Sequence, residues 1–138
     1  LLFGLREALA MLEEEGLPQV FARHTRLAEA CRRAVRAWGL EILCRDPAEY
    51  SSTLTAVVLP AGLDSDAFVA LAYRRLGLSL GIGLGEVKGR VFRIGHLGSL
   101  NELDLLGALG GVELALKQSG VPLRLGQGLA AAEEFLLG

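Results

Sequence analysis

Apolar residues recur at helical spacing through the first 38 positions of the chain. Leucines occur every three or four positions in residues 1–15, which predicts a helix ended by Gly16. A second helix should begin at Pro18, because proline suits a first helical turn, and end before Gly39. Its polar face carries the arginines Arg23, Arg26, Arg32, Arg33 and Arg36. We expect these arginines to form a solvated face.

Strand and helix patterns alternate after residue 39. We expect strands at residues 40–43, 53–59, 78–80 and 91–94, of which TLTAVVL at 53–59 is the richest in β-branched residues. Asp64 should cap a helix that runs to about residue 76. Ser99 and Glu102 have the spacing of a capping box, which predicts a helix to about residue 119, and LAAAEEFLL predicts a terminal helix. This order predicts a two-layer α+β domain whose sheet has one face covered by helices and the other open.

Composition limits the classes of function. A net charge of −2 gives no electrostatic basis for binding nucleic acid or an anionic membrane. Hydrophobic residues make up 51% and the mean hydropathy is +0.41, so we expect surface that meets another domain or subunit. The first residues lack a methionine and a signal peptide, and we expect a fragment of a longer chain. The chain ends in FLLG, which is not a peroxisomal targeting sequence, so a cytoplasmic location is expected.

The glycine run GIGLGEVKG, which contains Gly83 and Gly85, raises the question of phosphate binding. Glycine loops that bind phosphate lead from a strand into a helix, whose first amides hold the anion. This run leads instead into the predicted strand at 91–94, and it lacks both the Rossmann spacing and a Gly-Lys-Ser/Thr sequence. We therefore expect a flexible or positive-φ loop, or a loop that closes over a ligand held elsewhere.

Arg93 is the best-placed charged residue in the chain. Strand alternation puts Phe92 and Ile94 on one face and Arg93 on the other, which should be the open face. A guanidinium in that position suits a carboxylate or phosphate, although an ion pair with Glu86 or Glu102 remains open. His96 follows in the turn and is read as a structural or pocket-lining residue, while His24 is expected in the core.

Other reactive residues form no recognisable set. Cys31 and Cys44 have neither a disulfide framework nor a metal-ligand spacing, and neither histidine has suitable neighbours, so no metal is expected. The two lysines, Lys88 and Lys117, offer little for covalent chemistry with a carbonyl, which requires a desolvated lysine. The residues alone thus supply one arginine, an adjoining glycine loop and no catalytic set.

Two long stretches resemble a known family. LLFGLREALAMLEEEGLPQVFARHTRLAEACRRAV and SLGIGLGEVKGRVFRIGHLGSLNELDLLGALGGVELAL are similar to the C-terminal part of class V aminotransferases. The resemblance covers nearly the whole chain, is most specific in GRVFRIGHLG, and is greatest to serine–glyoxylate and alanine–glyoxylate aminotransferases. Phosphoserine aminotransferases and cysteine desulfurases are less similar in this motif.

The resemblance implies the C-terminal small domain, residues 1–138, of a fold-type I pyridoxal 5′-phosphate enzyme that is normally a homodimer. Such a domain has a mainly antiparallel sheet with helices on one face. The cofactor lysine belongs to the large domain of the family, so we expect no catalytic or cofactor-binding residue here and no activity from this chain alone. By resemblance Arg93 binds the substrate carboxylate, and Gly83, Gly85 and His96 are candidates to line the site.

Three interpretations therefore remain. The first is the small domain of a transaminase that moves an amino group from serine or alanine to glyoxylate or a similar 2-oxo acid. The second is another class V enzyme, of the phosphoserine aminotransferase or cysteine desulfurase type. The third is a non-enzymatic carboxylate-binding or dimerisation module.

Overall fold

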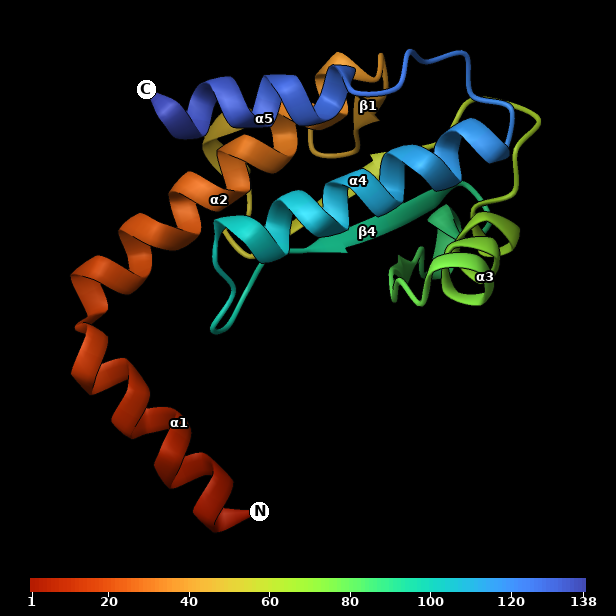
Figure 1. The fold of residues 1–138 in the computed structure, drawn as a ribbon. Coiled ribbons are helices and arrows are strands. Elements are labelled where there is room, and N and C mark those ends of the chain that lie inside the picture. Colours follow the sequence, from red (N-terminus) through yellow and green to blue (C-terminus); the bar gives the residue numbers. More distant parts are fainter.

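The computed structural model describes residues 1–138 and contains five α-helices and one four-stranded sheet (Figure 1). The helices are α1 (Leu2–Glu15), α2 (Leu17–Ala37), α3 (Ser65–Leu76), α4 (Glu102–Gln118) and α5 (Gln127–Leu137). The strands are β1 (Glu41–Ile42), β2 (Leu54–Val58), β3 (Gly81–Ile82) and β4 (Val91–Gly95), with single 3-10 turns at Pro47–Glu49 and Gly85–Val87. The predicted two-layer α+β architecture is confirmed.

The sheet has the order β1-β2-β4-β3, and all neighbouring strands are antiparallel. Phe92 of β4 lies opposite Val57 of β2, and all three residues Val57, Phe92 and Ile94 are at most 1% exposed. Helix α3 contributes Phe68, whose ring centroid lies 4.6 Å from that of Phe92. Because these residues share one face of the sheet, the helices cover that face and leave the other open.

A buried carboxylate joins three helices at one end of the core. Glu113 of α4 is 3% exposed and accepts hydrogen bonds from the indole Nε1 of Trp38 and the amide of Gly128, both at 2.8 Å. The amide of Gly126 donates to its other oxygen. Gly126 and Gly128 open α5, so Glu113 satisfies helix N-terminal amides that no side chain of α5 itself caps.

Two local predictions were wrong. Residues 78–80 form no strand, because the amide of Leu78 still bonds to the carbonyl of Ala72 at the end of α3, and the pairing with β4 begins at Gly81. The capping box of α4 is Asn101 with Asp104, whose side chains and amides bond reciprocally at 3.0 and 3.2 Å, and not Ser99 with Glu102.

The arginine face of α2 is not uniformly solvated, contrary to expectation. Arg32 is only 8% exposed, with its guanidinium carbon 4.9 Å from the ring centre of Tyr50. Its Nη1 donates to the carbonyl of Ser51 at 3.2 Å, and Arg23 is also engaged with other parts of the chain. Exposed side chains at Arg26, Arg33 and Arg36 agree with the prediction.

Helix α1 extends from the rest of the protein as an arm (Figure 1). None of its residues is buried, although it carries large apolar side chains such as Phe3 and Leu5, which are 86% and 56% exposed. Its junction with α2 is Gly16, which has φ +83°, a conformation that favours glycine. No helix of the protein combines the length and the apolar character needed to cross a membrane.

Candidate carboxylate-binding site

Arg93 lies at the centre of the open face of the sheet. Its strand, β4, runs between β2 and β3, and its neighbours across the two pairings are Ala56 and Gly81. Phe92 and Ile94, on either side of Arg93 in sequence, point into the helical core. The predicted orientation of Arg93 follows from this alternation and is the one that the structure shows.

Gly81 makes room for the arginine side chain. A Cβ atom at this position would lie 3.0 Å from Arg93 Nε and 3.1 Å from Arg93 Cβ, closer than most real Cβ contacts. The Arg93 side chain therefore lies directly over the glycine backbone of β3. Its Nε donates to the carbonyl of Ile82 at 3.0 Å, which fixes the direction of the guanidinium.

The two terminal nitrogens of Arg93 make no hydrogen bond or ion pair within the chain. Glu102, one of the two acids considered as a partner, instead pairs with Arg26, and Glu86 forms no ion pair. Because Nε is already bonded, the guanidinium presents its terminal edge, with both Nη groups side by side. Such an edge can bind the two oxygens of a carboxylate together.

The glycine run forms a tight hairpin between β3 and β4. The amide of Gly83 donates to the carbonyl of Val91 at 2.8 Å, and a Cβ on Gly83 would lie 2.4 Å from the carbonyl oxygen of Val87. Gly85 has φ +57°. The run thus forms a turn that leads into a strand, as expected. This turn precedes β4, which begins at Val91, two residues before Arg93.

His96 lies in the core, on the side of the sheet opposite to Arg93. It is fully buried, and its Nε2 accepts from the hydroxyl of Thr55 at 2.9 Å while Nδ1 donates to the carbonyl of Ser52 at 3.2 Å. Burial lowers the pKa of His96 to about 4, so the ring is neutral at pH 7. The structure thus places His96 as a buried, hydrogen-bonded residue and does not bring it to the face that carries Arg93.

The remaining reactive groups are apart from Arg93 or already bonded. Burial raises the pKa of the Cys31 thiol to about 12, and Cys44 lies in the loop after β1 with Sγ 3.5 Å from the carbonyl of Asp46. Lys117 Nζ donates to the carbonyl of Leu123 at 2.7 Å, and Lys88 follows the 3-10 turn of the hairpin. No group of three His, Cys, Asp or Glu side chains is arranged to hold a metal ion.

Sequence reasoning found Arg93 but missed the small residues around it. Ala56 and Gly81 lie opposite Arg93 on the neighbouring strands, and Gly95 lies two positions after it in β4. Because these residues have small side chains or none, the sheet surface around the guanidinium is not covered by side chains from these three positions. The register that brings these residues together joins segments about 12 and 37 positions away from Arg93, and no local pattern specifies it. Only the alternation of β4 itself was visible beforehand.

The antiparallel sheet with helices on one face matches the C-terminal domains of aminotransferases. The structure superposes on ureidoglycine–glyoxylate aminotransferase from Bacillus subtilis with a TM-score of 0.93 at 27% identity, over 99% of this chain and 35% of that chain. It superposes on pyridoxamine–pyruvate aminotransferase from Mesorhizobium loti with a TM-score of 0.91 at 35% identity, over 96% of this chain and 34% of that one.

Sequence identity is higher to serine–glyoxylate aminotransferases than to these two solved structures. Serine–glyoxylate aminotransferase from Hyphomicrobium methylovorum is 53% identical over 135 residues, which are 98% of this chain and 33% of that protein. No protein-family model matches the chain. The chain thus spans about a third of the length of the curated relatives it matches, as a C-terminal domain of such an enzyme would.

Proposed function

We propose that residues 1–138 are the C-terminal small domain of a pyridoxal 5′-phosphate-dependent aminotransferase. The proposed reaction moves an amino group from serine or alanine to glyoxylate or a similar 2-oxo acid. Identity of 53% to a serine–glyoxylate aminotransferase supports this reaction. The single structural observation that carries the proposal is the free terminal edge of Arg93 on the open face of the sheet.

Arg93 suits the two substrates of a transaminase equally well. An amino acid and a 2-oxo acid share a carboxylate next to the carbon that exchanges nitrogen and oxygen. A guanidinium held by the Ile82 carbonyl can bind each carboxylate in turn through two parallel hydrogen bonds. Two bonds to a fixed fork define an orientation as well as an affinity, so the reacting carbon is presented in one direction.

The residues of this chain do not fit the cofactor. Its covalent attachment needs a lysine with an uncharged, accessible amine, whereas the amine of Lys117 is bonded to the Leu123 carbonyl and Lys88 lies in the hairpin before β4. The glycine run enters a strand and offers no helix N-terminus to a phosphate. We therefore assign the cofactor to the part of the full-length enzyme outside these residues.

The site also needs a second wall. Arg93 lies on an open sheet face, so a further domain must enclose the substrate, and exposed apolar residues of α1 support contact with more protein. We propose a homodimeric full-length enzyme. A cytoplasmic location is supported by the free thiols of Cys31 and Cys44, which suit a reducing compartment.

Substitution of Arg93 in the full-length enzyme tests the proposal. Arg93→Gln should raise the KM for serine and for glyoxylate by roughly 10- to 100-fold, because hydrogen bonds to charged groups contribute about 1.5–3 kcal/mol. The visible absorbance of the bound cofactor should not change. Arg90→Gln, an exposed arginine just before β4, is the matched control and should leave both KM values unaltered. Unchanged KM values in Arg93→Gln would refute the role assigned to this residue.

A further inference from the structure

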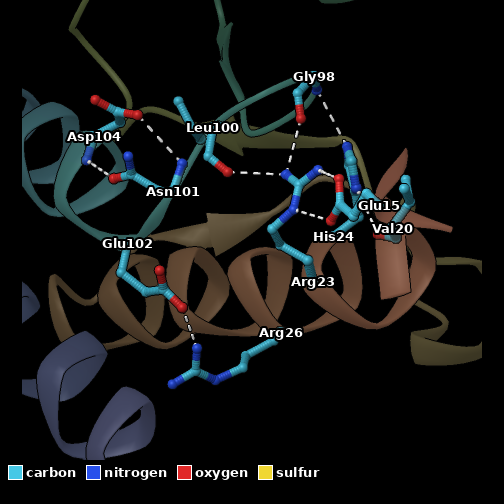
Figure 2. A network of polar contacts seen from close by, with 10 residues as sticks. All are labelled: Glu15, Val20, Arg23, His24, Arg26, Gly98, Leu100, Asn101, Glu102 and Asp104. Atoms are coloured by element: carbon cyan, nitrogen blue, oxygen red, sulfur yellow. Dashed lines mark hydrogen bonds and ion pairs between the residues drawn. The ribbon is translucent and has the colours of Figure 1, made fainter. Parts of the chain in front are cut away.

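Arg23 of α2 joins the end of α1 to the distant loop between β4 and α4 (Figure 2). Its Nε and Nη2 donate to the two carboxylate oxygens of Glu15, at 2.6 and 2.7 Å, at the end of α1. Its Nη1 donates to the carbonyls of Gly98 and Leu100, both at 2.9 Å, in the loop between β4 and α4. All three nitrogens of one guanidinium are therefore engaged.

His24, the next residue of α2, binds the same loop through the backbone amide of Gly98. Nδ1 of His24 donates to the carbonyl of Val20 at 2.7 Å, which leaves Nε2 as the acceptor for the amide of Gly98 at 3.1 Å. The N–H and the C=O of Gly98 are thus both bonded to α2. Gly98 has φ +82°, so this clasped position has a backbone conformation that favours glycine.

The clasped loop directly follows the strand that carries Arg93. Gly98 lies five residues after Arg93, and the pairing of β4 with β2 ends between them, at Gly95 opposite Leu54. The side chain of Leu97 lies over Gly95, where a Cβ would be 3.2 Å from Leu97 Cδ2. Leu97 is 57% exposed and lies over a residue that shares the open face with Arg93, so the path of the loop shapes that face.

The contact of Arg23 with Glu15 helps to set the direction of α1 relative to α2. This helix buries none of its residues, and Gly16 separates it from α2. The Glu15–Arg23 pair is the only ion pair between the two helices, and the Arg23 guanidinium lowers the pKa of the Glu15 carboxyl chiefly through these hydrogen bonds. A change in the direction of α1 would pull on Arg23 and hence on the two loop carbonyls.

We propose that Arg23 is a positioning residue that couples the direction of α1 to the loop at 97–101 and thereby to the carboxylate-binding face. This inference rests on the proposed function only for its effect on substrate. Arginine is required because a bidentate pair and two further carbonyls need donors on three nitrogens in one plane, which a lysine ammonium does not offer.

Hydrogen exchange on the full-length enzyme, without any substrate, tests the coupling. Arg23→Gln should speed amide exchange in residues 97–101 by at least about tenfold, because the loop loses two hydrogen bonds. Glu15→Gln leaves those two bonds intact but removes the charge on α1, and it should speed exchange of the same loop by a smaller factor. Arg36→Gln, an exposed arginine of the same helix paired with Glu29, is the control and should leave the loop unchanged. A loop that responds to Arg23→Gln and not to Glu15→Gln would overturn the coupling.

Kinetics of the full-length enzyme test the positioning role. Arg23→Gln should raise the KM for the amino donor by at least about threefold while kcat and cofactor absorbance stay near the wild-type values, since only substrate orientation is disturbed. If Arg93→Gln raises KM and Arg23→Gln does not, the positioning inference is wrong and the proposed function stands. If Arg93→Gln itself has no effect, the proposed function fails, and hydrogen exchange alone still decides the coupling.

Discussion

At the scale of single residues, alternation along β4 determines which side chains can act. It turns Arg93 outward and places Phe92, Ile94 and His96 inward, so the arginine and the histidine of one short motif lie on opposite sides of the sheet. The orientation of Arg93 was predictable from sequence. The position of His96 follows from the same alternation carried two residues further, but a turn was expected there and the strand continues to Gly95.

Gly81 is the residue whose substitution should disturb Arg93 with least effect on the rest of the fold. Gly81→Ala places a Cβ 3.0 Å from Arg93 Nε, so the guanidinium must shift away from the Ile82 carbonyl. We expect a KM for the amino donor raised by at least about threefold in the full-length enzyme. Gly107→Ala, on the exposed side of α4 with no atom near the new Cβ, is the control and should raise stability by up to about 1 kcal/mol. An unaltered KM in Gly81→Ala would show that the observed guanidinium position is not needed.

His96 should make the stability of the chain depend on pH between about 4 and 6.5. Burial lowers the pKa of His96 from 6.5 to about 4, so in this window the unfolded chain binds a proton that the folded chain does not. The contribution of neutral His96 to the unfolding free energy is fully present above pH 6.5. The unfolding free energy should fall by up to about 3 kcal/mol as the pH drops to 4. Urea unfolding across this range measures the effect. His96→Gln should flatten the curve, and equal slopes in both proteins would contradict the assignment.

At the scale of elements, tertiary contacts decide details that local signals leave open. The spacing of Ser99 and Glu102 satisfies the capping-box rule, yet Glu102 pairs with Arg26 of α2 and the box forms at Asn101 and Asp104. Helix α5 likewise has no side-chain cap of its own and depends on Glu113, which lies 13 residues before Gly126. Neither the pairing of Glu102 with Arg26 nor the contact of Glu113 with α5 could be identified from sequence. In both cases the packing of helices brings the partners together.

Glu113→Gln tests whether a carboxylate on α4 holds α5 in place. Burial alone would raise the pKa of Glu113, but hydrogen bonds from Trp38, Gly126 and Gly128 outweigh it and lower the pKa. The amide would keep one acceptor and set its NH₂ against backbone donors, so we expect a loss of roughly 2–4 kcal/mol in unfolding free energy. Because the folded-state pKa is lowered, the wild-type advantage should disappear as the pH falls below about 4.5. Thermal unfolding measures both effects, with exposed Glu133→Gln as the control; equal losses in the two variants would contradict the role.

At the scale of the whole molecule, the chain has one buried hydrophobic core, whereas α1 and the open face of the sheet are not covered by other parts of the chain. The order of helices and strands was largely predictable because strong periodicity and turn residues mark each element, whereas the sheet register was not. High mean hydropathy also anticipated exposed apolar surface, and the structure locates much of it on α1. An arm without buried residues and an arginine with a free edge both require contact with further protein for the proposed function.

The most direct measurement compares L-serine with L-serinamide, which lacks the carboxylate charge, in the full-length enzyme and in Arg93→Gln. If Arg93 binds the carboxylate, the wild-type enzyme should prefer serine in kcat/KM, and the variant should lose at least about tenfold of that preference, which corresponds to about 1.4 kcal/mol. The same preference in both enzymes would contradict the account, because it would show that the carboxylate is recognised elsewhere.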